Sequence, residues 1–315
     1  MTTSGELFAS LPSGIDICYE TFGSPDDPPV LLIMGLGGPM GWWDTRFCQM
    51  LADRGFFVIR YDNRDTGRST KLRQHKVGRV EIVRAFAGLR ILGGGKVPYT
   101  LSDLSDDAAG LLDHLGIEQV HLAGVSMGGM IAQTFAIEHP DRALSMTSIM
   151  STTGKRTVGF QNPKVFPVML SSAGRTRDSY VARSLKGSKV IGSPAFPTDE
   201  EAARARAYET YDRGWTASGV TRQMLAVLTQ PDRTEALRRL TLPVAVIHGL
   251  NDPLVHKSGG KATAAAIPGA EHLEIAGMAH DLPPQLYSTY ADTIARTAAR
   301  ATSAGESTST DEPTS

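Results

Sequence analysis

Residues 119–139 read QVHLAGVSMGGMIAQTFAIEH, and this stretch decides the fold class. It begins as an apolar strand, Gln119 to Gly124, and ends as a helix, Met127 to His139. The turn between them has the pattern G-x-S-x-G, in which flanking glycines leave room for a serine held in a strained backbone. The pattern alone arises often by chance in a chain with 32 glycines. Because a strand and a helix flank it, we expect Ser126 to be a nucleophile rather than an idle residue in a flexible turn.

The segments before this stretch predict further strands. Two short alternating runs, Glu6 to Ser13 and Ile15 to Phe22, meet at a Pro-Ser-Gly turn and are typical of an antiparallel hairpin. Val30 to Met34 and Phe56 to Tyr61 are mainly apolar, as expected of strands covered on both faces, and a helix from about Trp42 to Arg54 separates them. Strands that alternate with helices in this way form parallel sheets.

The segments after the serine continue the alternation. One further helix, beginning at Ser102, is expected before Ser126. After Ser126 we expect strand Ala143 to Met150, strand Pro243 to His248, helix Gly259 to Ile267, strand Ala270 to Ile275 and helix Pro284 to Arg300. We therefore predict an α/β fold with a mostly parallel, eight-stranded sheet and helices on both faces.

One part of the chain departs from this alternation. Residues 154–231 contain helical patterns without apolar strands between them, which predicts a helical cap inserted into a core of residues 1–153 and 232–301. Residues 302–315 are rich in Ser, Thr and Glu, and we expect them to form a disordered tail.

Composition and charge limit the classes of ligand. The formal net charge is −1, too small for the basic surface typical of nucleic-acid binders, so no nucleic-acid partner is expected. Cys18 and Cys48 lack the spacing of metal ligands, and we interpret them as buried free thiols. The N-terminus has no basic start or apolar run, and no stretch approaches eighteen consecutive apolar residues. These features favour a soluble, cytoplasmic protein.

Asp252 is the candidate acid. A serine hydroxyl needs an adjacent base, and in folds with this turn the partners follow the serine in the order acid, then histidine. Asp252 follows strand Pro243 to His248, at the carboxyl edge of the sheet where active sites of such folds lie. The other position for an acid, residues 151–154, contains no carboxylate. The alternative role for Asp252 is a turn or helix cap before Pro253.

His280 is the candidate base. It comes directly after the last predicted strand, in a loop whose glycine and small residues let an imidazole approach the serine. The chain has eight histidines, and the other seven have plainer explanations: they lie in strands, end a helix, precede the serine or flank the acid. The alternative for His280 is a surface loop histidine without a chemical role.

An oxyanion hole needs two backbone N–H groups. The residue after the nucleophile, Met127, is expected to supply one, and the glycine-rich loop Gly35 to Gly38 the other. Leu36 is the expected donor in that loop because it directly follows the first glycine after strand Val30 to Met34. The alternative is a merely tight glycine turn.

These elements, in this order, resemble the α/β-hydrolase superfamily over residues 6 to about 300. The quoted motifs are similar to those of the aclacinomycin methylesterase group and related actinobacterial esterase/lipases: Ile33-Met34-Gly35, Tyr61 to Ser69, Ser126-Met127-Gly128 and Ile275 to His280. The resemblance implies the α/β-hydrolase fold and a triad of Ser126, Asp252 and His280. Met34 stands where many members of the superfamily carry histidine, a replacement that this group shares.

Two segments carry an excess of positive charge. Residues 71–96 contain seven basic residues and one acid, Glu81, and residues 154–230 contain twelve basic and six acidic residues. If both segments overhang Ser126, the mouth of the site is positive and attracts anionic substrates or an anionic lipid surface. The alternative is that these charges lie on ordinary solvated faces.

The expected reaction is hydrolysis of a small-molecule or lipid-like carboxylic ester through an acyl-enzyme, without a metal or an organic cofactor. The same triad also serves thioesterases, phospholipases and enzymes that hydrolyse lactones or carbon–carbon bonds. In a different class, a non-catalytic or single-turnover ligand receptor can retain a hydrolase scaffold. The sequence pattern does not separate these alternatives, and it leaves acyl-chain length, leaving group and oligomeric state open.

Overall fold

The computed structural model describes residues 3–88, 97–167 and 176–308. Its central sheet has eight strands in the order β1-β2-β4-β3-β5-β6-β7-β8, antiparallel where β2 pairs with β1 and β4 and parallel elsewhere. The strands are β1 Leu7–Ser10, β2 Asp16–Phe22, β3 Pro29–Ile33, β4 Phe57–Tyr61, β5 Val120–Val125, β6 Ala143–Ile149, β7 Val244–Gly249 and β8 Glu271–Ile275. The predicted α/β fold with a mostly parallel sheet of eight strands is confirmed.

Helices cover both faces of this sheet because the central strands are apolar on both sides. Leu31 and Ile33 of β3 face a layer made by α3 (Leu101–His114), α4 (Met127–Glu138), α9 (Thr234–Leu237) and α10 (Ser258–Ala266). Val30 and Leu32 face the opposite layer, which contains α1 (Thr45–Ala52) and α11 (Tyr287–Thr308). Alternate residues of β3 therefore point into opposite layers. Because both layers are buried, every residue of the strand is apolar and its sequence is an unbroken apolar run.

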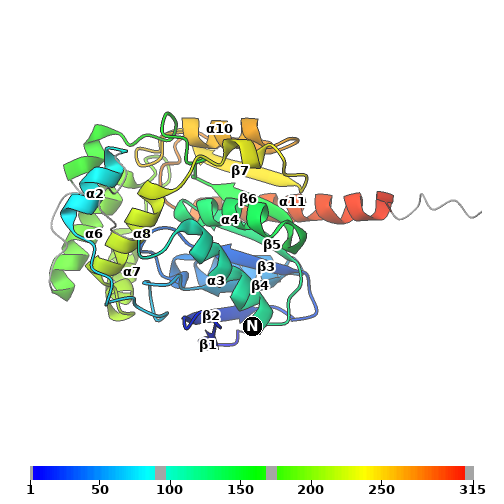
Figure 1. Cartoon of the computed structure of the whole chain (residues 1–315), viewed down its shortest axis with the longest axis horizontal. Helices are drawn as coiled ribbons and strands as arrows, with labels where there is room; N and C mark the ends of the chain where they lie inside the picture. The colour runs from blue at the N-terminus through cyan, green and yellow to red at the C-terminus, as the bar shows by residue number, and fades with distance from the viewer. Residues whose placement is uncertain (1–2, 89–96, 168–175, 309–315) are drawn as a thin grey trace, which may run out of the picture.

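A group of helices lies at one end of the sheet. Figure 1 shows α2 (Arg79–Phe86), α6 (Arg177–Ile191), α7 (Glu200–Asp212) and α8 (Ala217–Thr229) gathered there. The last three belong to the segment 154–231, which also contains the short 3-10 helix η3 (Pro163–Val165), and they have a small apolar core around Tyr180, Leu185 and Ala207. Helix α2 was not predicted; it comes from the basic segment 71–96 and packs against α8. Residues 89–96 and 168–175, parts of the two basic segments, lie outside the described residues.

The C-terminal helix is longer than predicted. α11 continues from Tyr287 to Thr308 and leaves the body of the molecule (Figure 1). The helix thus overlaps the first part of the tail expected to be disordered, at residues 302–308, while residues 309–315 lie outside the described part. Each residue added to an existing helix gains a hydrogen bond without a new nucleation cost, which lets a polar sequence extend a packed helix.

Candidate active site

Ser126 lies in the turn between β5 and α4. Its backbone has φ 55° and ψ −117°, a conformation that L-residues rarely adopt. A Cβ atom on Gly124 would lie 2.2 Å from the carbonyl oxygen of Gly128, and one on Gly128 would lie 2.0 Å from that of Ile33. Both positions therefore require glycine, and the strained turn presents the Ser126 side chain at the end of β5.

Ser126, His280 and Asp252 meet in the folded chain. The Nε2 atom of His280 lies 3.0 Å from Ser126 Oγ, and its Nδ1 atom lies 2.7 Å from Asp252 Oδ2. A carboxylate oxygen can only accept, so Nδ1 carries the proton and Nε2 is left to accept the proton of the serine hydroxyl. Side chains in this arrangement can serve as a nucleophile, a base and a group that orients the base.

Asp252 uses its two oxygens differently. Oδ1 accepts hydrogen bonds from the backbone N–H groups of Leu254 and Val255, at 2.8 and 2.9 Å. Oδ2 faces His280. The carboxylate thus completes a turn with one oxygen and contacts the imidazole with the other, so the turn holds it beside the histidine.

The glycine-rich loop after β3 lies beside the serine. A Cβ atom on Gly35 would lie 3.2 Å from Ser126 Cβ and 3.8 Å from its Oγ. Within the described residues, neither Leu36 N nor Met127 N donates a hydrogen bond to a protein acceptor. These are the two N–H groups expected from the sequence to form an oxyanion hole.

The comparison with known families agrees with this geometry. Residues 28–284 match the family model described as alpha/beta hydrolase fold. The chain belongs to this family. It is therefore an α/β-hydrolase, and the resemblance drawn from its motifs is confirmed.

Relatives of this α/β-hydrolase include a methylesterase and an enol-lactonase. The chain is 28% identical over 301 residues to rhodomycin D methylesterase of Streptomyces peucetius, covering 89% of this chain and 94% of that protein. It is 27% identical over 243 residues to 3-oxoadipate enol-lactonase 2 of Acinetobacter baylyi, covering 77% and 78%. The solved enol-lactonase of Burkholderia xenovorans superposes with a TM-score of 0.71 at 21% identity, covering 92% of this chain and 99% of that one.

In this α/β-hydrolase the described helices of residues 154–231, called the cap from here on, contact the loop that carries His280. The backbone N–H of His280 donates to the carbonyl of Ile191, at the end of α6, at 2.9 Å. Ser193 Oγ accepts the N–H of Ala279 at 2.8 Å and donates to the carboxylate of Asp281. Burial raises the pKa of Asp281, and the Ser193 contacts oppose that shift. No local pattern identifies Ser193, because its partners are distant along the chain.

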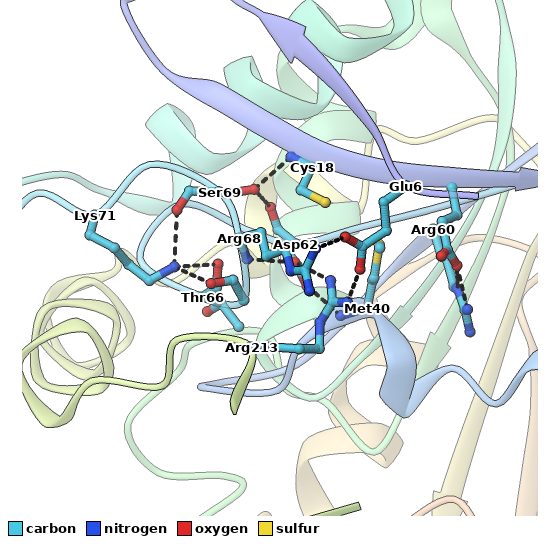
Figure 2. Close-up of polar contacts among 12 residues, drawn as sticks. Glu6, Cys18, Met40, Arg60, Asp62, Thr66, Arg68, Ser69, Lys71 and Arg213 are labelled. Carbon is cyan, nitrogen blue, oxygen red and sulfur yellow. Dashed lines mark hydrogen bonds and ion pairs between the residues drawn. The ribbon is translucent and has the colours of Figure 1, made fainter. Parts of the chain in front are cut away.

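A second set of cap contacts reaches the turn that follows β4, shown in Figure 2. Arg213, just beyond α7, forms an ion pair with Asp62 at 2.7 Å and another with Glu6. Burial alone would lower the pKa of Arg213, but the two carboxylates raise it. The other oxygen of Asp62, Oδ1, accepts the N–H of Met40 at 2.6 Å. Asp62 thus lies between the cap and the end of the glycine-rich loop.

Several residues of the two basic segments face inward. Lys71 Nζ donates to the carbonyl oxygens of Thr66 and Ser69 at 2.9 and 3.0 Å (Figure 2), and burial lowers its pKa to about 8. Arg222 is buried against Asp65, with Nη2 2.6 Å from Oδ1. With Arg213 also paired, the cap is less positive toward solvent than its composition predicts.

His248, expected only to flank the acid in the sequence, contacts Asp252 in the folded chain. Its Nε2 atom lies 3.5 Å from Asp252 Oδ2 and 2.8 Å from the carbonyl oxygen of Val255. Because that carbonyl accepts, Nε2 carries a proton that also faces the Asp252 carboxylate. Burial lowers the pKa of His248, which favours the neutral ring.

Three further observations bear on the sequence predictions. Both cysteines are free and buried, as predicted, and burial raises the pKa of each thiol to about 12. The described residues contain one group with metal-ligand geometry, exposed Asp106 and Glu138 with half-buried His139, at the end of α4 far from Ser126. No helix in the described ranges is both long and apolar enough to cross a bilayer.

Proposed function

We propose that this α/β-hydrolase hydrolyses carboxylic esters, with Ser126 as nucleophile, His280 as base and Asp252 as the group that orients the imidazole. The observation that carries the proposal is the pair of hydrogen bonds, Ser126 Oγ to His280 Nε2 and His280 Nδ1 to Asp252 Oδ2, beside a strained serine. The methylesterase relative supports an ester as the substrate class.

The reaction proceeds in two stages. Ser126 Oγ attacks the ester carbonyl carbon while its proton passes to His280 Nε2; the carbon–oxygen bond then breaks, and the alcohol leaves with that proton. Water next gives a proton to His280 and attacks the acyl carbon. The carboxylic acid departs, and Ser126 regains its hydroxyl proton. The N–H groups of Leu36 and Met127 donate to the oxyanion in both stages, each lowering the barrier by about 3 kcal/mol.

The experiment that tests this function is hydrolysis of a panel of nitrophenyl esters, lactones, acyl-thioesters and phospholipids by the wild type, Ser126→Ala and a control, Ser24→Ala. Ser24 is an exposed serine in a loop, so its replacement is expected to leave activity unchanged. Loss of activity in Ser126→Ala alone supports serine hydrolysis, and the panel ranks the substrates, thioesters and phospholipids being the main alternatives. Equal activity of all three proteins contradicts the proposal, and no activity in any of them favours the receptor.

We also propose that this protein is cytoplasmic and binds reversibly to anionic lipid surfaces through α2. Val80, Val83 and Phe86 recur every third residue on this helix, with 58%, 65% and 46% of each side chain exposed. Exposed basic side chains at Lys76 and Arg84 accompany them. A helix with an exposed apolar stripe and flanking cations is typical of binding at the interface of an anionic bilayer.

Co-sedimentation with phosphatidylglycerol and phosphatidylcholine vesicles tests this contact. The wild type is expected to bind phosphatidylglycerol vesicles more strongly, and Val80→Ser/Val83→Ser to lose most of that binding. Phe8→Ser is the control, because Phe8 is 51% exposed on β1, outside the basic segments. Binding that is equal for both lipids, or unchanged in the α2 variant, overturns the proposal.

A further inference from the structure

Gln223 connects the cap to the glycine-rich loop. It lies on α8, and none of its side chain is exposed to solvent. Its Oε1 accepts the backbone N–H of Gly37 at 2.8 Å. Its Nε2 donates to the carbonyl of Arg64 at 2.9 Å and to Thr66 Oγ1 at 2.8 Å. Both ends of the amide are therefore bonded, which fixes its orientation.

The contact with Gly37 falls at the tip of the loop. The start of the loop is held where Asn63 Nδ2 donates to the Met34 carbonyl at 3.0 Å, and its end where Met40 donates to Asp62. Between these points, the described structure gives the loop one hydrogen bond to a side chain, that of Gln223. Gly37 has φ 68°, and its would-be Cβ lies 3.0 Å from Val220 of α8, so α8 packs directly on the tip.

The peptide that Gln223 holds joins Leu36 to Gly37. Fixing the N–H of Gly37 fixes the plane of that peptide and so limits rotation at Leu36. The N–H of Leu36 must point at the developing oxyanion within a few tenths of an ångström to be effective. The side chain of Gln223 thus restrains the backbone at Leu36, and the direction of the Leu36 N–H group matters most to the proposed oxyanion hole.

We infer that Gln223 is a positioning residue for the oxyanion hole, through which the cap sets the direction of the Leu36 N–H group. The inference rests on the proposed function, because it assigns a role to a hole that acts only if Ser126 forms tetrahedral intermediates. A buried glutamine that only filled space and satisfied its neighbours would leave the chemistry of the oxyanion unaffected.

The test compares Gln223→Met with Gln230→Met on an ester and on the matching thionoester, in which sulfur replaces the carbonyl oxygen. Sulfur is a weak acceptor, so the thionoester intermediate gains little from the hole. Gln223→Met is expected to lower kcat for the ester about 10- to 100-fold with little change in KM, and to lower thionoester turnover much less. Gln230, also in the cap, bonds Val227 and Arg233 and leaves the loop untouched, so its variant keeps the wild-type ratio.

Thr66→Val provides a second, milder variant should Gln223→Met fail to fold, as judged by thermal unfolding. It removes the hydroxyl that accepts from Gln223 and is expected to lower the ester-to-thionoester ratio in the same direction. Equal losses on both substrates, or an unchanged ratio in Thr66→Val, overturn the inference. Failure of the proposed function is separately visible, because Ser126→Ala would then retain ester hydrolysis.

Discussion

At the scale of single residues, Asp252 combines two tasks in one carboxylate. One oxygen completes the turn that follows β7, and the other faces the imidazole. Because Oδ1 is bonded within the backbone turn, the carboxylate keeps its second oxygen directed at His280. This division predicts that the chemical and structural contributions of Asp252 can be separated by a substitution that preserves the turn.

Asp252→Asn is expected to lower kcat by about 10³- to 10⁴-fold while leaving the fold intact. The amide oxygen can still accept from Leu254 and Val255, but the amide nitrogen then faces His280 and favours the tautomer with its proton on Nε2. Such a ring cannot accept the Ser126 proton. The measurement is steady-state kinetics beside thermal unfolding. A variant with near-wild-type kcat, or one that does not fold, would contradict this division of roles.

The same scale shows what a sequence can and cannot reveal about a site. Ser126, Asp252 and His280 were predicted because each follows a recognisable strand and the chain order is restrictive. Gln223 gave no signal, because its partners are backbone atoms and a hydroxyl up to 186 positions away. A side chain whose role consists of holding a distant loop has no local pattern to identify it.

At the scale of elements, the turn after β4 joins the sheet to α8. Asp65 has φ 70°, a strained conformation, and its side chain accepts from Leu72 N, Tyr99 Oη and the guanidinium of Arg222. Arg222 and Asp65 side chains are 1% and 0% exposed. Such a pair stabilises little compared with apolar packing, but removing one partner leaves a buried charge without compensation.

Arg222→Met is therefore expected to lower the free energy of unfolding by about 3–5 kcal/mol, as measured by urea denaturation. Combining it with Asp65→Asn removes the stranded charge and is expected to recover part of the loss. The partial recovery is the distinguishing result, since a simple cavity effect would make the double variant at least as unstable as Arg222→Met.

The strand β5 carries a buried histidine that makes stability depend on pH. His121 is 4% exposed beside Ser145, and burial lowers its pKa to about 4. The unfolded chain takes up this proton near pH 6.5, whereas the folded chain resists until about pH 4. Its contribution to stability is thus complete above pH 6.5 and is lost as the pH falls toward 4.

His121→Asn is expected to flatten this dependence. Between pH 6.5 and 4 the wild type should lose on the order of 2–3 kcal/mol more unfolding free energy than the variant. Urea denaturation at several pH values gives both slopes, so a constant offset caused by the lost ring does not affect the comparison. Equal slopes for the wild type and His121→Asn would show that another group causes the loss of unfolding free energy at acidic pH.

Elements differ in how well a sequence predicts them. The central strands were placed within one or two residues, because burial on both faces produces unbroken apolar runs. Helix α2 was missed because three of its apolar residues, Val80, Val83 and Phe86, are exposed to solvent and obscure the pattern of a helix with one buried face. The extension of α11 beyond Arg300 was missed because the prediction used only the polar composition of the tail, and composition carries no information about the packed helix that precedes it.

At the scale of the whole molecule, the charge of the cap could not be predicted from its composition. Arg213 and Arg222 come from the basic segment 154–230, yet both pair with acids of the sheet domain. Net charge by segment is fixed by the sequence, but which charges neutralise one another depends on contacts between distant segments. These pairs attach the cap to the turn after β4 and reduce the positive field expected at the mouth.

The cap also contacts the proposed machinery at two separate places, which leads to a prediction for the molecule as a whole. Gln223 bonds the loop of Leu36, and Ser193 bonds Ala279 and Asp281 on either side of His280. Ser193→Ala is expected to lower kcat about 10-fold by loosening the histidine, with KM little changed. Because it acts on the base, this variant should lower ester and thionoester turnover alike, unlike Gln223→Met.

The double variant, Ser193→Ala with Gln223→Met, shows whether the two contacts act independently. If each restrains its own loop, the losses in kcat multiply, since effects at separate sites add as free energies. If the cap moves as one body and either contact alone holds it in place, the second substitution adds little to the loss in kcat caused by the first. Steady-state kinetics of the two single variants and the double variant form the required cycle. We expect multiplication, because Gln223 is anchored on Arg64 and Thr66 whether or not Ser193 holds the histidine loop.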